Sequence, residues 1–148
     1  MSESEGTTDH ERARTLLSRI STRVAHIQKK AFGKGPVSTK SYMFDDMLLV
    51  VMRDSLTQAE QTMLGFGQPD LVRNFRQQFE NEMTPRLVAE IEELTDRKVL
   101  TYQSQIMFDP DIVVEVFVFD RASDFEQRVA TAQGQIDEDA AGEVSGDA

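Results

Sequence analysis

Two short apolar stretches constrain the fold of this chain most strongly. They are "MLLVVM" at Met47–Met52 and "IVVEVFVF" at Ile112–Phe119. A strand with one face in water alternates apolar and polar residues, whereas these two are apolar on both sides except at Glu115. We therefore predict strands of a sheet whose two faces both need cover. The first helix of the chain or a second copy of the chain would supply it, and we favour a homodimer.

Each apolar strand has a neighbour across a short turn. The segment Val37–Phe44 is separated from the first by Asp45 and Asp46, and Lys98–Phe108 is separated from the second by Asp109–Asp111. Aspartate and proline favour tight turns, because they adopt the required backbone angles or accept local hydrogen bonds. The pattern predicts two β-hairpins, and so four antiparallel strands.

A helix is predicted from Asp9 to Ala31, where apolar residues recur at alternating steps of four and three. These residues are Ala13, Leu17, Ile20, Val24, Ile27 and Ala31. The following "FGKGP" has two interpretations, a helix stop or a loop that binds phosphate. A phosphate loop places its glycines between a strand and a following helix, and here the helix comes first. We therefore predict that Gly33 ends the helix in a left-handed conformation and that Pro36 prevents its continuation.

Two more helices follow the first hairpin. Thr57 and Glu60 form a T-x-x-E capping box, which predicts a short helix that ends at Gly65 or Gly67. Pro69 is typical of the first turn of a new, longer helix.

The longer helix has a predicted buried stripe that runs through a proline. Its residues are Leu71, Phe75, Phe79, Met83, Leu87, Ile91 and Leu94. Because proline removes one backbone hydrogen bond, we expect Pro85 to bend the helix near Met83, with Thr84 capping a new start.

The order of these elements predicts an α+β fold, a four-stranded antiparallel sheet with an N-terminal helix, a short helix and a long kinked helix packed on it. Residues 9–132 of the 148 form one predicted domain. Residues 1–8 and 133–148 are small, polar and mostly acidic, and we predict flexible tails there. The chain has no cysteine, no long apolar run and no secretory signal, so we expect a cytoplasmic location.

The net charge of −10 is unevenly distributed. Residues 9–40 hold eight basic and two acidic side chains, whereas residues 120–148 hold two basic and eight acidic ones. This asymmetry indicates an anionic partner for the first helix or a contact between that helix and an acidic tail.

The whole pattern resembles the MpsC family, which is named for a component of a sodium-translocating, membrane-potential-generating system. Five stretches carry the resemblance in the same order, namely "FGKGP" at 32–36, "DDMLLVVMRDSLTQAE" at 45–60, "LVRNFRQQF" at 71–79, "IEELTDRKV" at 91–99 and "DPDIVVEVFVFD" at 109–120. The chain departs from the family pattern at Asp96, where relatives often have glycine, and at Pro85. The resemblance implies an accessory role in ion or inorganic-carbon transport.

The candidate functional acid is Glu115, which interrupts an otherwise apolar strand. A buried carboxylate must be paired, protonated or placed at an interface, because burial of a bare charge is costly. Arg53, Arg97 and Lys98 are the cations that a neighbouring strand could bring to it. We expect a structural ion pair, with a pH-sensitive or functional acid as the alternative.

The candidate binding feature is a basic stripe, which we define as Arg12, Arg19, Arg23 and Lys30. These side chains lie beside the apolar side of the first helix at steps of seven, four and seven. Such a stripe attracts anionic lipid headgroups or an acidic protein surface. The alternative is a solvated helix flank whose charges are neutralised by neighbouring acids. Nucleic acid is not expected, since exposed aromatic residues are not interleaved with the stripe.

Catalytic, metal and cofactor sites are not predicted. The paired aspartates at the two hairpin turns would bind a cation only if both turns pointed to the same place. His10 lies at the start of the first helix and His26 beside its apolar side, where we expect surface or interface residues, and no motif for nucleophilic catalysis is present.

We therefore expect a non-enzymatic accessory or regulatory module, without a cofactor, that acts beside a membrane transport protein for cations such as sodium or for inorganic carbon. It would form a homodimer and lie in the cytoplasm, peripheral to the membrane. The alternative is a sensing or catalytic domain that binds a small molecule between its sheet and helices.

Overall fold

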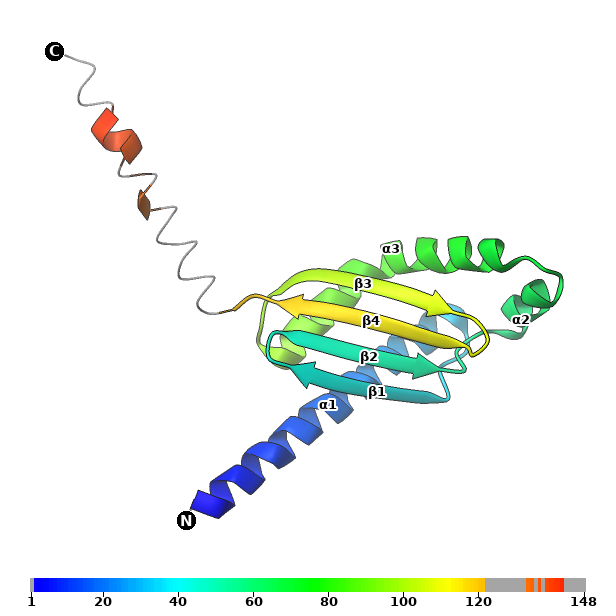
Figure 1. Cartoon of the computed structure of the whole chain (residues 1–148), viewed down its shortest axis with the longest axis horizontal. Coiled ribbons are helices and arrows are strands. Elements are labelled where there is room, and N and C mark those ends of the chain that lie inside the picture. Colours follow the sequence, from blue (N-terminus) through cyan, green and yellow to red (C-terminus); the bar gives the residue numbers. More distant parts are fainter. Residues whose placement is uncertain (1, 122–132, 135, 137, 143–148) are drawn as a thin grey trace.

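The computed structural model describes residues 2–121, 133–134, 136 and 138–142. Its elements are α1 (Ser2–Phe32), β1 (Ser38–Phe44), β2 (Met47–Arg53), α2 (Gln58–Gly65), α3 (Pro69–Thr95), β3 (Val99–Met107) and β4 (Ile112–Phe119). The four strands form one antiparallel sheet, and both long helices lie on the same side of it (Figure 1). The predicted α+β class and the two hairpins are confirmed.

The two apolar strands lie side by side in the centre of the sheet. The strand order is β1-β2-β4-β3, so β2 pairs with β4 although the long helix separates them in sequence. In the register of this pair Val50 lies opposite Glu115, and Leu48 lies opposite Phe117. All four of these side chains point to the helices, because alternate residues of a strand share one face.

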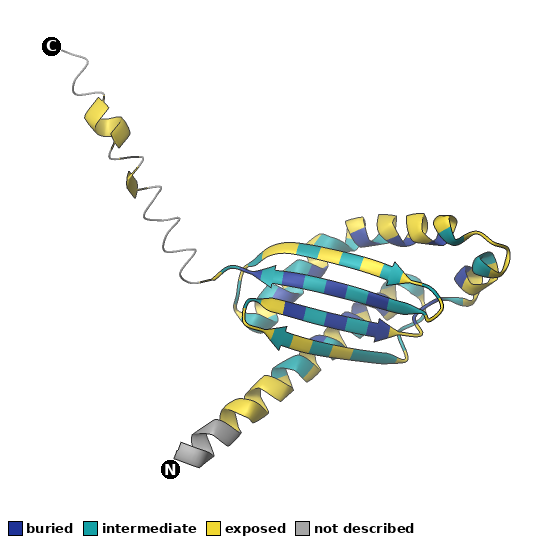
Figure 2. Cartoon of the chain, viewed as in Figure 1, coloured by how far each residue is buried: buried dark blue, intermediate teal, exposed yellow. Residues whose placement is uncertain are grey.

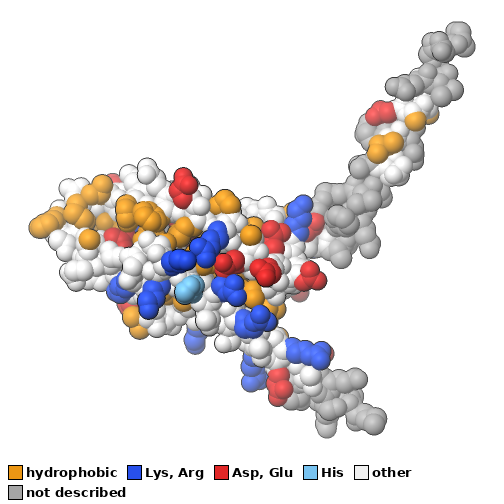
Figure 3. Space-filling model, turned by 180° about the vertical axis from the view of Figure 1, so that it is seen from behind, with side chains coloured by type: hydrophobic (Ala, Val, Ile, Leu, Met, Phe, Trp, Pro, Cys, Tyr) orange, Lys and Arg blue, Asp and Glu red, His pale blue; other side chains and the backbone are white. Residues whose placement is uncertain are grey.

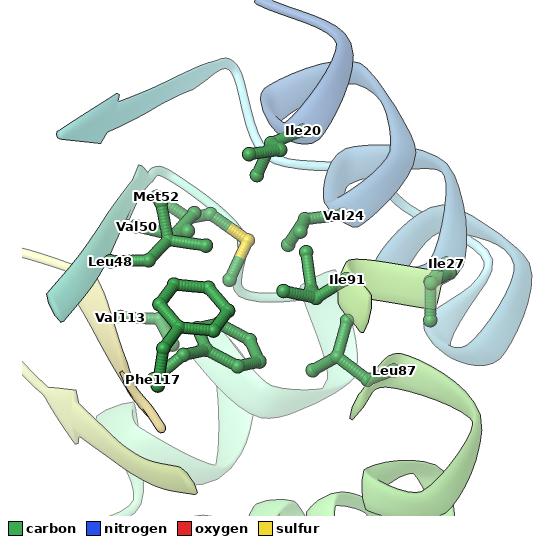
Figure 4. Packing of buried hydrophobic residues seen from close by; sticks show 11 residues of the cluster. Ile20, Val24, Ile27, Leu48, Val50, Met52, Leu87, Ile91, Val113 and Phe117 are labelled. Atoms are coloured by element: carbon green, nitrogen blue, oxygen red, sulfur yellow. The ribbon is translucent and has the colours of Figure 1, made fainter. Parts of the chain in front are cut away.

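The core fills the space between the sheet and the two long helices (Figure 4). Its buried members are Ile20, Val24, Ile27, Leu48, Val50, Met52, Leu87, Ile91, Val113, Phe117 and Phe119. Three of them come from the predicted apolar side of α1, which therefore packs inward as expected.

The other face of the sheet, which we call the open face, is not covered by any described residue. Leu49, Val51, Val114 and Val116 are only half-buried there, and Tyr42 is 41% exposed. Figure 2 shows this face as bands of half-buried and exposed residues between the buried ones. The suggestion that α1 covers the second face is wrong, because α1 and α3 pack side by side on the first. A second copy of the chain remains the predicted cover.

The first helix ends where the sequence predicts but begins earlier. Gly33 has a φ of 78°, and its N–H donates to the carbonyl O of Lys29 at 2.8 Å, so it is the left-handed stop. The helix begins at Ser2 rather than at Asp9, so it includes most of the segment that we assigned to an N-terminal tail. Most of the predicted C-terminal tail lies outside the described residues, and residues 133–134, 136 and 138–142 are helical.

The second helix has the predicted capping box. Thr57 Oγ1 accepts from the N–H of Glu60 at 3.2 Å, and a Glu60 carboxylate oxygen accepts from the N–H of Thr57 at 3.0 Å. Each group satisfies a backbone donor that a helix start leaves without a partner. The box is therefore why α2 begins at this point.

The third helix is continuous through Pro85. The prediction that Thr84 caps a new start is wrong, because its hydroxyl donates back to the carbonyl O of Glu80. The helix ends at Thr95, and the residue that follows, Asp96, has a left-handed φ of 52° and donates its N–H to the carbonyl O of Glu92. An aspartate tolerates this left-handed conformation, for which glycine is the usual residue.

The buried stripe of α3 is rotated from the predicted one in the first half of the helix. Its buried residues are Val72, Arg76, Glu80, Leu87 and Ile91. Leu71 and Phe75 are 51% and 46% exposed, so the prediction that these two residues belong to the core is wrong. Two charged side chains have taken the inner side of the helix, and two large apolar ones face water.

This rotation gives a direct test by two matched substitutions in one helix. We expect Leu87→Ala to lower the free energy of unfolding by about 2–5 kcal/mol, since Leu87 is 1% exposed and its loss leaves a cavity. Leu71→Ala should cost less than about 1 kcal/mol, because half of its surface is already in water. Urea unfolding monitored by circular dichroism measures both, and equal losses would contradict the rotated stripe.

Candidate functional site

Two carboxylates are buried together between the sheet and the helices. Glu115 of β4 is 0% exposed and Glu80 of α3 is 6% exposed. Gln28 of α1 lies between them, and its Nε2 donates to Glu115 Oε1 at 3.3 Å and to Glu80 Oε1 at 3.4 Å. Tyr102 of β3 donates its hydroxyl hydrogen to Glu80 Oε2 at 2.6 Å. We call Glu80 and Glu115 the acid pair.

Local structure explains how four elements bring these side chains together. Glu115 points inward because the residues on either side of it in β4, Val114 and Val116, point to the open face. The ring of Tyr102 packs at 4.8 Å from that of Phe117, which fixes the position of its hydroxyl. Glu80 follows Arg76 by one turn on the buried side of α3.

Sequence reasoning found only one member of this cluster. Gln28 and Tyr102 carry no sequence signal that separates them from ordinary surface residues. Glu80 was missed because we predicted a different buried side for α3. The apolar residues Leu71, Phe75 and Phe79 recur with the helical period and were taken as that side. Val72, Arg76 and Glu80 recur with the same spacing and could have predicted the buried side. Two of the three are charged, and charged residues are not expected in a core.

The predicted ion pair of Glu115 is wrong. Among the described residues no lysine or arginine pairs with either member of the acid pair, and Arg53 and Lys98 are exposed. Arg97 instead lies 4.6 Å from the ring centre of Phe119 and donates to the carbonyl O of Asp45. Strand alternation decides this outcome, because those cations lie at strand ends and Glu115 lies mid-strand on the inner face.

Burial and the neighbouring acid change the protonation of the site. Burial first, and then the charge of Glu80, raise the pKa of Glu115 to about 8, while hydrogen bonds from Tyr102 and Gln28 oppose the rise. The pKa of Tyr102 is also raised, by burial and by both carboxylates, so its hydroxyl stays a donor. The alternative that Glu115 is a pH-sensitive acid thus gains physical support.

Two hollows lie between α3 and β3 beside the acid pair. One has a volume of about 170 Å³ and the other of about 330 Å³. Both are lined by Gln77, Glu80 and Ser104. The larger one is also bordered by the amides of Asn81 and Gln103, so this approach to Glu80 is polar and carries no positive charge.

A second buried charged group, Arg76, holds α2 on α3. Its Nε and Nη2 donate to the two carboxylate oxygens of Glu60 at 2.5 and 2.7 Å, and Nη2 also donates to the carbonyl O of Ser55. The guanidinium lies 3.9 Å from the ring centre of Phe32. Burial alone would raise the pKa of Glu60, but hydrogen bonds from Arg76 and from the backbone of Thr57 lower it. With all its partners present, this ion pair acts as a structural clamp.

The basic stripe is exposed along α1, as Figure 3 shows on the helix-covered side of the molecule. Arg12 approaches Asp9 at 4.0 Å, and Arg23 approaches Glu90 at 3.5 Å. Arg19 and Lys30 have no ion pair within the part of the chain that the structure describes. The stripe is therefore only partly neutralised by neighbouring acids.

The acidic turns lie at opposite ends of the sheet, so their four aspartates cannot bind one ion (Figure 1). Asp46 instead pairs with Arg121 at 2.8 Å, and Asp111 Oδ2 accepts from the N–H of Leu56. Across the described ranges no three acidic or histidine side chains are arranged to hold a metal ion. His10 and His26 are both exposed on α1.

Fold and site together define a class of protein, a small α+β module with two helices on one face of a four-stranded sheet and a buried acid pair beneath it. The family model described as "Na+-translocating membrane potential-generating system (MpsC)" matches residues 12–121. The chain belongs to the MpsC family. Comparison with curated proteins and with solved structures gave no match. Within the described residues, none of the helices has the length and apolar character that a membrane span requires.

The acid pair gives the stability of the fold a predicted pH dependence. The pKa of Glu115 rises from 4.5 in the unfolded chain to about 8 in the folded one, so between these values the folded state keeps a proton that the unfolded state has lost. The contribution of Glu115 to the free energy of unfolding is therefore largest below about pH 4.5, and it falls as the pH rises toward 8.

We expect Glu115→Gln to remove this fall. The variant should match the natural protein at acidic pH and exceed it by a few kcal/mol near pH 8, since each pKa unit corresponds to about 1.4 kcal/mol. Urea unfolding over the pH range, in buffers of low salt, measures the difference. Glu93→Gln, on the exposed side of α3, is the control and should leave the pH profile unchanged. If the unfolding free energies of Glu115→Gln and of the natural protein changed with pH in parallel, Glu115 would not titrate in this way.

Proposed function

We propose that this protein is a non-enzymatic accessory module of a membrane-potential-generating system, and that it works on the cytoplasmic surface of the membrane beside a transport protein for cations, sodium in particular, or for inorganic carbon. Family membership supports the association with such a system. The observation that carries the membrane-surface role is the exposure of the basic stripe on α1, with Arg19 and Lys30 unpaired among the described residues. Each basic residue close to an anionic bilayer contributes about 1 kcal/mol of attraction.

An apolar corner adjoins the stripe on the same side of the molecule (Figure 3). We define it as Phe66, Leu71 and Phe75, which are 73%, 51% and 46% exposed. Phe32, near the end of α1, packs at 6.4 Å from the ring of Phe75, so the basic end of α1 lies against this corner. Exposed aromatic and leucine side chains next to lysines and arginines are typical of surfaces that lie in the membrane interface.

A second candidate function is the sensing of a small molecule in the larger hollow between α3 and β3. Its volume of about 330 Å³ is at the lower limit of ligand pockets. Its lining is polar, whereas ligand pockets are mostly apolar, and we therefore place this function second.

Charge reversal tests the membrane-surface role. We expect the double variant Arg19→Glu with Arg23→Glu to lose most of its binding to vesicles of phosphatidylglycerol, because four units of charge are changed where lipid headgroups would lie. Co-sedimentation with the vesicles measures binding. The control is Lys98→Glu with Arg121→Glu, which makes the same change of charge at positions outside α1 and should retain binding. Equal binding by both double variants would show that the stripe is a solvated flank.

We also propose that the open face of the sheet is covered by a second copy of this chain. The centre of this face is apolar and without charge, at Leu49, Val51, Val114 and Val116. Its charged residues, Lys40 and Arg53, lie on β1 and β2, and the edge strand β3 presents uncharged side chains such as Thr101, Gln103 and Gln105. A two-fold axis parallel to the strands places β1 of one copy over β3 of the other, so the cations meet no like charge.

The dimer is tested by its dissociation. We expect the natural protein to have the mass of a dimer in light scattering and Val116→Lys to be a folded monomer, because a lysine in the middle of the covered face would be buried without a partner. Thr22→Lys, exposed on α1, is the control and should stay dimeric. A monomeric natural protein at micromolar concentration would rule out this use of the open face.

A further inference from the structure

The outer edge of β3 is an unpaired strand edge. In the strand order β1-β2-β4-β3, no described segment pairs with this side of β3. Free strand edges pair readily with other chains, and proteins usually block them with charged side chains, proline or an irregular backbone. From Thr101 to Met107 β3 has none of these, because its irregularity lies before Thr101 and its residues there are uncharged. The other edge strand, β1, has Lys40 near its centre. The edge of β3 is therefore the one that is open to a further strand.

The hydrogen bonds of β4 show which backbone groups of β3 point outward. The N–H of Phe119 donates to the carbonyl O of Asp46, on the β2 side. Directions alternate along a strand, so every second residue of β4 before Phe119 also turns its backbone groups to β2 and away from β3. The β3 residues opposite those positions turn their own N–H and C=O groups to the outer edge. They are Tyr102, Ser104 and Ile106. The side-chain amide of Gln105 reaches this edge and donates to the carbonyl O of Ile106 at 3.4 Å, a place that a backbone N–H of an added strand can take.

A groove runs along this edge between β3 and the first half of α3, which projects past β3 in Figure 1. We call it the edge groove, and it contains the two hollows described above. The smaller hollow is bordered by Ile106, the larger by Tyr102, and Ser104 belongs to both. The hollows are thus offset by two residues along β3. This offset equals the repeat of side chains on one face of a strand, so two alternate residues of an added strand would each meet one hollow.

The larger hollow has one charged group in its lining, Glu80. Glu80 is 6% exposed, and its carboxylate accepts hydrogen bonds from two neutral side chains, Tyr102 and Gln28. Among the described residues no lysine or arginine forms an ion pair with it. A buried carboxylate without a cation favours a partner that brings a positive charge.

The smaller hollow has a different electrostatic character. Arg73 and Arg76 both contribute to its lining. Arg76 is held by Glu60, and Arg73 pairs with Asp70 at 3.1 Å. Because two guanidinium groups border this hollow, a positive charge is favoured in the larger hollow and an uncharged side chain in the smaller one.

We propose that the edge groove binds an extended segment of a partner polypeptide, which adds to the sheet as a strand beside β3 and places a lysine or arginine side chain in the larger hollow at Glu80. In this mode of recognition the main-chain hydrogen bonds give affinity, and the pockets for alternate side chains give specificity. The polar lining of the larger hollow suits the charged end of such a side chain. A second copy of this chain paired through its own β3 would bring no cation to Glu80, since Val99–Met107 contains no basic residue.

This inference goes beyond the proposed function and does not depend on membrane docking. The edge groove lies between α3 and β3, whereas the basic stripe lies on α1. Vesicle binding can therefore fail while peptide binding stands, and the reverse.

Selection from random peptides tests the groove without knowledge of the partner. The probe is a phage library of peptides of about eight residues, a usual strand length, and the bait is the immobilised full chain. We expect the selected peptides to share a lysine or arginine and to lack proline beside it, because proline cannot donate a backbone hydrogen bond to the edge. Selected peptides without an enriched basic residue would overturn the proposal, and so would a failure to enrich any peptide.

Matched variants locate the binding, measured by fluorescence polarisation with the most enriched peptide. Glu80→Gln keeps the shape of the side chain and should weaken binding at least about tenfold, because the charge pair is lost. Glu93→Gln, on the exposed side of α3, should bind as the natural protein does. Equal affinities of these two variants would overturn the proposal, since attraction of a basic peptide to an acidic protein in general would then explain the binding.

A second pair of variants tests the backbone edge. Ser104→Pro removes an outward N–H and leaves the hydrogen bonds between β3 and β4 in place, so it should abolish peptide binding. Ser104→Ala removes the same hydroxyl but keeps the N–H, and it should bind normally. Circular dichroism checks that both fold, and if Ser104→Pro does not, the Glu80 pair decides. Equal binding by the two folded variants would overturn strand addition. A lower mass of Ser104→Pro in light scattering would also overturn it, because the edge would then pair with a second copy.

Discussion

The packing of α1 and α3 side by side on one face of the sheet determines most of what this protein can do. Two helices are enough to cover one face of four strands, and the core residues of β2 and β4 point to them. The same arrangement leaves the other face of these strands without cover from any described residue, although it is also apolar. It also brings α1, α3, β3 and β4 together around one point, where their polar residues form the acid pair and its partners.

Local chemistry in the sequence was enough to predict the elements. Three predicted features depend only on residues that are a few positions apart in the sequence, and all three are confirmed. They are the turn at Asp45 and Asp46, the capping box at Thr57 and the helix stop at Gly33. The layer on which α1 packs was not predictable in this way. Both faces of β2 and β4 are apolar, so the sequence does not say which face receives a helix. That choice depends on where α3 lies, and α3 is set by the long-range pairing of β2 with β4.

The stripe of α3 shows why a periodic pattern can mislead at a functional site. Leu71 and Phe75 have the right spacing for a core, but the inner position belongs to Arg76, because the carboxylate of Glu60 arrives there from the capping box of α2. An ion pair that is satisfied on every side can be buried, and the apolar side of the helix then turns to water. The sequence showed that the buried charge of Glu115 needs a partner or a proton, but it did not show which residue lies beside Glu115. We predicted a basic partner from a neighbouring strand, but in the structure the charged neighbour of Glu115 is a second acid, Glu80 of α3.

The first helix links the interior site to the outer surface. Gln28 lies on its inner side against the acid pair, and the basic stripe lies on its outer side. Gln28 donates to Glu80 of α3 and to Glu115 of β4, so the acid pair joins three elements at one point. A change in the protonation of Glu115 would therefore act on the packing of α1 against α3 and β4, because the hydrogen bonds of Gln28 hold these elements together there.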